Sequence, residues 1–354
     1  MEKFCVFCGR KPIDKNKEHV IPLWLIKATG DPDRQIVLGT LFGEHPIDRP
    51  KLMAFDQLTF PACSTCNAAG ATLESAVRPV VFKMLKEERV SGAELTILMD
   101  WLDKIRIGLW LGQYHYLSKN PLSSPPPFTY INRAIGACDR MLHILEAYPE
   151  ERGLVISGTE SSAFGMQPYC FGLTINQFSF VYLSFPFCVS RALGIPYSEQ
   201  LFVNGQNLVS PIMRPGSEFI DNKAWAADGV SSQIIQGITL EGIQDVCHPL
   251  YACEYTRRVL QGGRRTLPHL RLASNWARIE DGGEAQWRPS RTISGKQFLA
   301  TITKKVLGLQ RYTLHAMSYE KLDAAERKVA EERKRLALEQ IECALKEAEW
   351  SAVV

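Results

Sequence analysis

The chain has 354 residues, of which 45% are hydrophobic and 22% are charged, and its formal net charge is +3. This ordinary globular composition excludes wholesale disorder, collagen and low-complexity scaffolds. No apolar run approaches the length of a membrane span, and the first residues lack the apolar region of a secretion signal. We therefore expect a soluble, cytoplasmic protein that does not bind membranes.

Two long helices are predicted in the first third of the chain. Apolar residues recur at helical spacing over residues 67–89. Ser91 and Glu94 then match a capping box, so a second helix is expected to begin there and to end near residue 117. A shorter helix is expected over residues 132–146.

The middle third of the chain predicts a small, mostly antiparallel sheet. Residues 153–157, 164–175 and 177–186 are rich in aromatic and β-branched side chains. Asn176 lies between the last two runs, where a hairpin turn fits. Residues 234–260 are expected to be helical in part.

The last segment of the chain is charged and helix-forming. One apolar row recurs every seven residues, at Leu322, Val329, Leu336, Cys343 and Trp350. A second row contains Leu338, Ile341, Leu345 and Ala348. A long helix docked on its own domain would explain this pattern, and so would a coiled-coil contact that makes a homodimer.

These elements together indicate an α+β fold in three parts. The N-terminal unit would span residues 1–90. An α+β domain for recognition or regulation would span residues 91–316, and the C-terminal helix would occupy residues 317–354.

Four cysteines form two tight pairs, Cys5-x-x-Cys8 and Cys63-x-x-Cys66. A CxxC turn supplies two ligands at once, and two such turns can arrange four thiolates tetrahedrally around zinc. In a reducing compartment this spacing favours a metal site over disulfides. We therefore predict a structural Zn²⁺ held by all four cysteines, a closed site that does no chemistry by itself.

The residues beside these pairs carry a second pattern. After the first pair comes the run Glu18-His19-Val20-Ile21-Pro22-Leu23-Trp24-Leu25, and Asn67 follows directly on Cys66, with Leu73-Glu74 six residues later. This combination resembles the zinc-containing HNH endonucleases of the ββα-metal (His-Me finger) superfamily, and especially a set of uncharacterised bacterial HNH proteins. The resemblance covers about the first 90 residues and implies a ββα-metal unit there.

The resemblance also implies a role for three residues. His19 would be the general base that activates water, and Glu18 and Asn67 would bind one catalytic Mg²⁺ or Mn²⁺. General chemistry agrees, because a neutral imidazole suits base catalysis near pH 7 and a hard cation prefers oxygen ligands. The implied reaction is hydrolysis of a phosphodiester that leaves 5′-phosphate and 3′-hydroxyl ends.

The sequence departs from the HNH pattern at the middle Asn, which orients the catalytic histidine. That position, nine residues before Asn67, holds Leu58. Asp56 and Gln57 are close enough to substitute, since a carboxylate on the far imidazole nitrogen fixes the tautomer. Either residue could take this role.

Two site residues also have a purely structural interpretation. Asn67 is a residue type that caps helix N-termini well, and it could be both cap and ligand. Glu74 would lie on the same helix face as Asn67. It could reach the metal, although an ion pair with Arg78 is the favoured interpretation.

The segment from Arg257 to Arg311 is strongly basic. It carries twelve lysine and arginine residues against three acidic ones, a local charge of +9. A segment of this kind could follow a phosphate backbone. We expect nucleic-acid contacts from five of its arginines, Arg257, Arg258, Arg264, Arg265 and Arg271. DNA is the expected partner, with RNA as the alternative.

Three functions are therefore compatible with the sequence. The first, which the resemblance implies, is a metal-dependent HNH endonuclease acting on DNA, whose layout resembles that of effectors in bacterial anti-phage defence. The second is a non-catalytic zinc-ribbon module that binds nucleic acid or protein. The third is a nuclease subunit that is inactive until it assembles with a partner, such as a sensor protein or an ATPase.

Overall fold

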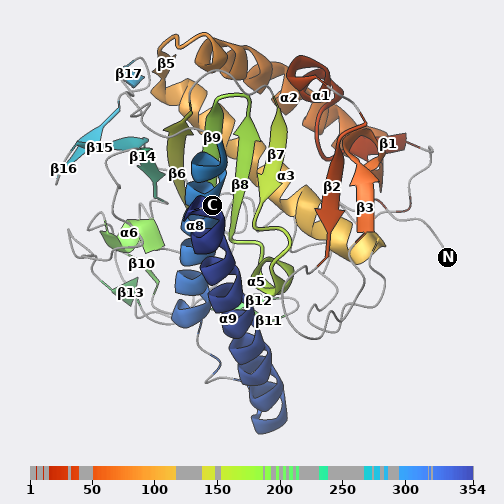
Figure 1. Ribbon diagram of the computed structural model, residues 1–354, viewed down its shortest axis with the longest axis vertical. Coiled ribbons are helices and arrows are strands. Elements are labelled where there is room, and N and C mark those ends of the chain that lie inside the picture. Colours follow the sequence, from red (N-terminus) through yellow and green to blue (C-terminus); the bar gives the residue numbers. More distant parts are fainter. Residues whose placement is uncertain are drawn as a thin grey trace.

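The computed structural model describes Cys5, Lys11 and the ranges 16–30, 33–39, 51–116, 138–147, 153–185, 188–192, 197–198, 202–204, 207–209, 213–214, 231–237, 267–272, 275–279, 283–285, 295–317, 319 and 322–353. The fold is α+β, as the sequence predicts (Figure 1). Its helices are α1 (Leu23–Thr29), α2 (Ser64–Leu85), α3 (Gly92–Tyr116), α5 (Ser162–Met166), α6 (Cys188–Ala192), α8 (Gly295–Ala316) and α9 (Ala324–Val353), with a 3₁₀ turn, η1 (Phe55–Gln57). None of the helices described here combines the length and the apolar character that a membrane span requires.

An antiparallel sheet of seven strands forms the centre of the described part, in the order β16-β15-β14-β6-β9-β8-β7. Its strands are β6 (Asp139–Glu146), β7 (Leu154–Ser157), β8 (Cys170–Ile175), β9 (Phe178–Phe185), β14 (Ser231–Gln236), β15 (His269–Leu272) and β16 (Asn275–Arg278). The remaining strands form two-stranded pairs: β1 (Asn16–His19) with β4 (Thr59–Ala62), β2 (Gln35–Leu38) with β3 (Lys51–Ala54), β5 (Val90–Ser91) with β17 (Glu284–Ala285), β10 (Tyr197–Ser198) with β13 (Met213–Arg214), and β11 (Phe202–Asn204) with β12 (Asn207–Val209).

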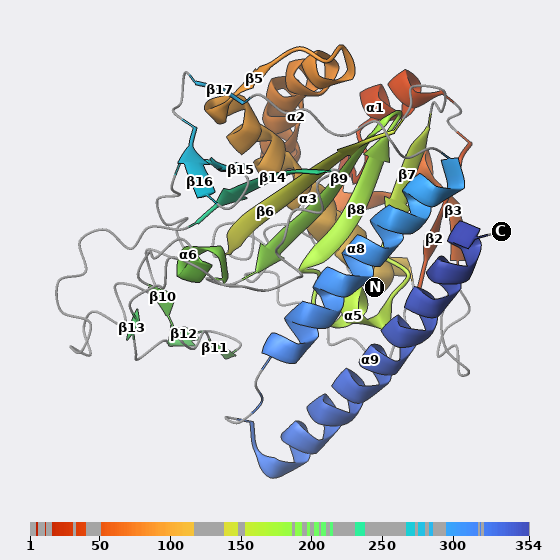
Figure 2. The same ribbon diagram turned by 60° about the vertical axis from the view of Figure 1, so that its left-hand side comes forward.

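The central strands are buried on both faces. Along β6, Leu142 and Ile144 pack into a core shared with α2 and α3, whereas Met141 and Leu145 pack into a second core with α8. Side chains alternate between the faces of a strand, which explains this division. Figure 2 shows the resulting layers, with α3 on one side of the sheet and α8 on the other, and α9 packed against α8.

The helix that the sequence predicts over residues 132–146 is wrong where the structure describes this segment, because strand β6 lies there. Residues 139–146 form a central strand between β14 and β9, and residues 132–137 lie outside the described ranges. All eight residues of β6 are buried. A short, continuously buried run has no two-residue alternation of polarity, so periodicity cannot separate such a strand from a buried helix.

Two further predictions are wrong at their edges. Phe164 lies in α5 and not in a strand, because the Ser161 hydroxyl accepts the Phe164 backbone N–H at 3.2 Å and starts a helical turn. Ile234 lies in β14 and not in a helix, because it pairs with Leu142 of β6. Residues 235 and 236 belong to β14 as well, and residues 238–260 lie outside the described part of the chain.

Local sequence signals that depend on neighbouring residues are confirmed. The Ser91 N–H donates to Glu94 Oε2 at 2.8 Å, and the Glu94 N–H donates to Ser91 Oγ at 3.2 Å, which is a complete capping box at the start of α3. Asn176 turns the β8–β9 hairpin with φ at 52°, a backbone conformation that asparagine tolerates.

Helix α9 is present as predicted and docks on the protein's own α8. Ala337, Ile341 and Ala344 pack with α5 and α8, and Leu338 and Leu345 lie beside them. Of the seven-residue row, Leu322, which precedes α9, is exposed, and so are Val329 and Cys343 on the helix. The docking interpretation is therefore confirmed, and the coiled-coil contact stays a prediction.

The N-terminal unit is built from β1, β4 and α2, and α3 joins it to the sheet. Strands β1 and β4 pair antiparallel, and α2 begins two residues after β4 ends. The apolar core continues from Val20 through α3 to Phe171 and Phe180 of the sheet. The packing therefore runs across the predicted boundary at residue 90.

The close approach of α3 to the N-terminal unit gives a stability prediction. A Cβ on Gly108 would lie 2.8 Å from Val20 Cγ1, whereas a Cβ on Gly308 of α8 would meet nothing within 4 Å. For Gly108→Ala we expect overpacking of about 1–3 kcal/mol to outweigh a helix-propensity gain of about 1 kcal/mol. Gly308→Ala should instead raise stability by about 0.5–1 kcal/mol.

Urea unfolding of the two variants measures both effects in the same protein. A Gly108→Ala variant that is as stable as Gly308→Ala would contradict the close approach of α3 to Val20.

Candidate functional site

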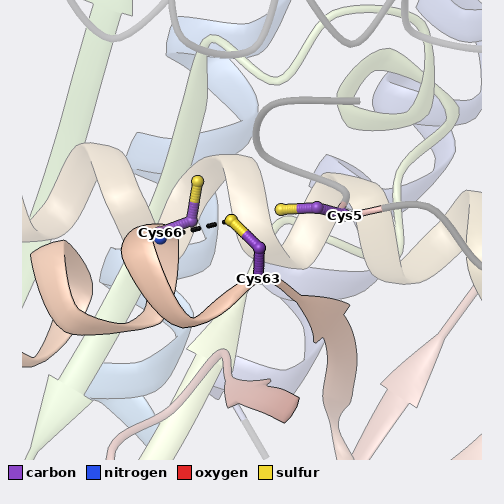
Figure 3. Close-up of side chains that lie close together, drawn as sticks. All are labelled: Cys5, Cys63 and Cys66. Atoms are coloured by element: carbon purple, nitrogen blue, oxygen red, sulfur yellow. Dashed lines mark hydrogen bonds between the residues drawn. The ribbon is translucent and has the colours of Figure 1, made fainter. Parts of the chain in front are cut away.

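Three cysteines meet at the start of α2 (Figure 3). The Sγ atoms of Cys5, Cys63 and Cys66 all lie within 4.8 Å of one another. In the part of the chain that the structure describes, this is the only group of three or more His, Cys, Asp or Glu side chains with metal-binding geometry. Cys8, the predicted fourth ligand, lies outside the described residues. The cluster could bind a metal ion, and three of the four predicted ligands are together.

The local backbone explains how Cys63 and Cys66 come to face the same point. Cys63 is the N-cap of α2, and its Sγ accepts the Cys66 backbone N–H at 3.5 Å. The Asn67 N–H donates to the Cys63 carbonyl at 2.9 Å, as an early residue of the helix does. Asn67 is therefore not the cap, which corrects that interpretation, because the helix begins at Ser64 and not at residue 67.

Strand β1 positions Glu18 and His19 beside this helix. Glu18 pairs with Phe60 and His19 with Thr59, near the start of the strand that leads into Cys63. Neighbouring residues of a strand point to opposite faces. Glu18 is buried, with 5% of its surface exposed, whereas His19 is half-buried.

A lysine from α3 joins two carboxylates at this point. The Lys104 ammonium forms direct ion pairs with Oε1 of Glu18 and with Oε1 of Glu74. The side chains of Lys104 and Glu18 are 8% and 7% exposed, and that of Glu74 is 20% exposed, so the group is shielded from water. The ion pair of Glu74 with Arg78 that the sequence favours is wrong. Arg78 instead lies over the Phe82 ring, 5.8 Å from its centroid.

Gly70 allows the Glu18 carboxylate to approach α2. A Cβ at this position would lie 2.7 Å from Glu18 Oε1 and 3.3 Å from Lys104 Nζ. Glu74 follows one turn later, and Asn67 precedes Gly70 by three residues, so the three share one helix face. Asn67 is half-buried at the start of that face.

The electrostatic surroundings of β1 shift the pKa values of both Glu18 and His19. Burial raises the pKa of Glu18 above its usual 4.5, and the Lys104 ammonium opposes this shift. Burial lowers the pKa of His19 below its usual 6.5, while the carboxylates of Glu74 and Asp56 oppose that shift. The His19 imidazole is therefore favoured in its neutral form, the form that can accept a proton.

Asp56, Gln57 and Leu58 occupy different environments. Leu58 is fully buried in the core, and its carbonyl accepts the Val20 N–H at 3.0 Å. Asp56 and Gln57 lie in the exposed turn η1. The charge of Asp56 raises the pKa of His19 and so opposes the effect of burial, an influence that the neutral Gln57 cannot exert.

The predicted nucleic-acid residues are mostly outside the described part of the chain. Residues 257, 258, 264 and 265 are not described, and Arg271 is described only as a residue of β15 paired with Trp276. Their contact with nucleic acid stays a prediction.

Lys104 is the residue that sequence reasoning missed. It stands in an apolar helix pattern between Trp101 and Ile105, and a lysine inside such a pattern is the signal that could have singled it out. Its partners are contributed by a strand and by another helix, so no local spacing could have named them.

Comparison with known proteins identifies no related protein. No protein-family model matches the chain, and no curated protein or solved structure is matched either.

The cysteine cluster predicts a bound metal ion. We expect about one ion per chain, measured by plasma mass spectrometry on purified protein. Cys66→Ser should lose most of the ion and lower the melting temperature, because folding and metal binding are coupled at such sites. Cys343→Ser, an exposed cysteine on α9, is the matched control and should keep both. Equal metal content in the two variants would contradict the site.

The half-buried position of His19 predicts its titration. Its imidazole should titrate below pH 6.5 in an NMR pH series, with His19→Gln assigning the signal. Because the folded state binds this proton less well than the unfolded state, the contribution of His19 to stability is present above pH 6.5 and declines as the pH falls below it. A midpoint at or above 6.5 would show that the carboxylates outweigh burial.

Proposed function

We propose that the protein is a metal-dependent endonuclease of the HNH type that hydrolyses phosphodiester bonds of DNA. The observation that carries the proposal is the position of His19 and Glu18. Both lie on a strand paired antiparallel with β4, which leads through the cysteine cluster into α2. An antiparallel strand pair followed by a helix is the arrangement that the HNH resemblance implies for a ββα-metal unit.

The cysteine cluster supports a structural role for zinc in this proposal. Thiolate ligands favour zinc among the common metals of proteins, and a closed cysteine site has no open position for a substrate. The ion would be held by Cys5, Cys63 and Cys66, with Cys8 as the fourth ligand. It would join the start of α2 to the N-terminal segment that contains Cys5 and precedes β1, and so hold the helix face that carries Gly70 and Glu74 near Glu18.

The residues around Glu18 fit a second, oxygen-bound cation. Two carboxylates, those of Glu18 and Glu74, already converge on the positive charge of the Lys104 ammonium. Glu18 and Asn67 would hold Mg²⁺ or Mn²⁺, which when bound supplies positive charge at the phosphate. His19, favoured in its neutral form, would take a proton from the attacking water onto an imidazole nitrogen.

Asp56 would act through His19 in this scheme. Its carboxylate stabilises the imidazolium that forms when His19 accepts the proton, since its charge raises the pKa of that group. The basic segment 257–311 would hold the DNA backbone, and the sheet region would carry recognition or regulation. An effector role in defence against phage is part of the same proposal.

A second candidate function is a non-catalytic zinc-binding module for nucleic acid or protein. The observation that favours it is the ion pair between Lys104 and Glu18, which neutralises a carboxylate that the nuclease would use for its metal. The buried Leu58 in place of the middle Asn favours it as well. A nuclease subunit that requires a partner is the third candidate.

Nicking of supercoiled plasmid with Mg²⁺ or Mn²⁺ tests the first candidate. We expect cleavage by the wild-type protein and a loss of at least about 100-fold in His19→Ala, because general-base catalysis contributes about 10²–10⁴-fold. The control is the metal content of both proteins, which should be equal, since His19 is not part of the cysteine cluster.

The other outcomes separate the candidates. Equal cleavage by both proteins would contradict the assignment of His19. Absence of cleavage by either one would favour the binding module or the subunit that needs a partner.

A further inference from the structure

The group formed by Glu18, Glu74 and Lys104 carries a surplus of negative charge. Two carboxylates share one ammonium, so the formal charges of the three side chains sum to −1 in a shielded position. Charges removed from water are stable only when they are paired, and here the pairing is incomplete. The positive partner, moreover, comes from α3, outside the strand pair and helix of the proposed catalytic unit.

We propose that the Lys104 ammonium occupies the position of the divalent cation, and that the cation displaces it when it binds. This inference rests on the proposed function and deepens it, because it names Lys104 and Glu74 as residues of the same site. Lys104 is then a positioning residue that keeps Glu18 and Glu74 directed at one point while no metal is bound.

The geometry at α2 explains why the carboxylates stay in place while the ammonium can move. Gly70 lies so close to Glu18 Oε1 that a Cβ there would come within 2.7 Å, so α2 bounds the carboxylate on one side. The lysine has four methylene groups between its backbone and its charge, and these allow the ammonium to change position while the backbone of α3 stays in place. A displaced ammonium would remain beside the site, where it can attract a phosphate.

Charge accounting favours a divalent over a monovalent occupant. The two carboxylates and the ammonium have a total charge of −1. When a divalent cation takes the position between the carboxylates and the displaced ammonium stays nearby, the total charge becomes +1. A positive group is suited to a phosphodiester, whereas a negative group would repel it. The ion pair thus keeps the site closed to phosphate until a cation arrives.

The alternative is a permanent structural ion pair that never exchanges. The two cases differ in the effect of Lys104 on metal affinity. If the Lys104 ammonium occupies the position of the metal, it competes with the metal, so removing the ammonium strengthens metal binding. A structural pair supports the fold, so its removal weakens metal binding or leaves it unchanged.

The test is Mn²⁺ binding to the zinc-loaded full-length protein without nucleic acid, followed by electron paramagnetic resonance of the free ion. Lys104→Met removes the charge and keeps an unbranched side chain. One opposite charge within about 4–6 Å changes the proton affinity of a carboxylate by about 10–1,000-fold. We therefore expect Lys104→Met to bind Mn²⁺ at least about tenfold more tightly than the wild type.

Two further variants keep the test decisive if Lys104→Met folds poorly. Lys83→Met breaks a lysine–glutamate pair with Glu94 elsewhere on α2 and α3, and it should leave Mn²⁺ affinity unchanged. Glu74→Gln removes one carboxylate and keeps the pair of Lys104 with Glu18, and it should weaken Mn²⁺ binding by about tenfold.

The inference is overturned if Lys104→Met binds Mn²⁺ no more tightly than the wild type, if Glu74→Gln binds it equally well, or if none of the proteins binds it. Because no substrate is present, these results are independent of cleavage. Tighter binding in Lys104→Met together with absent plasmid nicking would support the cation site and favour the binding module or the subunit that needs a partner over a nuclease that acts alone.

Discussion

The burial of α3 is the constraint on which the rest of the structure depends. Every residue from Trp101 to Gln113 is buried, although this stretch includes charged side chains. A charge removed from water without a partner costs several kcal/mol, so each buried charge on α3 needs a partner, from the helix itself or from an element that covers it. On the side of the N-terminal unit, Lys104 meets Glu18 and Glu74. On the side of the sheet, Asp103 forms ion pairs with Arg106 and with Arg140 of β6.

This arrangement connects the candidate site to the sheet through consecutive residues of one helix. Asp103 and Lys104 are neighbours in sequence, and they take partners from different layers of the fold. Arg106 adds a hydrogen bond of 2.5 Å to the Pro168 carbonyl, next to β8. The sheet region is therefore part of the framework that holds the site, and it is more than an appended domain.

The features predicted correctly from the sequence are those specified by neighbouring residues. The capping box of Ser91 and Glu94, the turn at Asn176 and the helix at the C-terminus each follow from spacings within a few residues. Strand β6 shows the limit of such reasoning. Its burial comes from β14, β9 and the helices on both faces. The run mixes buried charged and apolar side chains without a two-residue alternation, so its pattern contains no record of which neighbours will cover it.

For the candidate site, the sequence by itself determined which residue types are present and that the two CxxC motifs belong to one site. Two CxxC motifs predict a shared ion, because thiolates at this spacing can converge on one point. The run that begins with Glu18-His19, between the two motifs, singled out these two residues as candidates. Only the tertiary structure decided the partner of Glu18. Lys104 and Glu74 lie on separate helices, and they meet Glu18 because α2 and α3 pack together over β1, where buried charges must be paired.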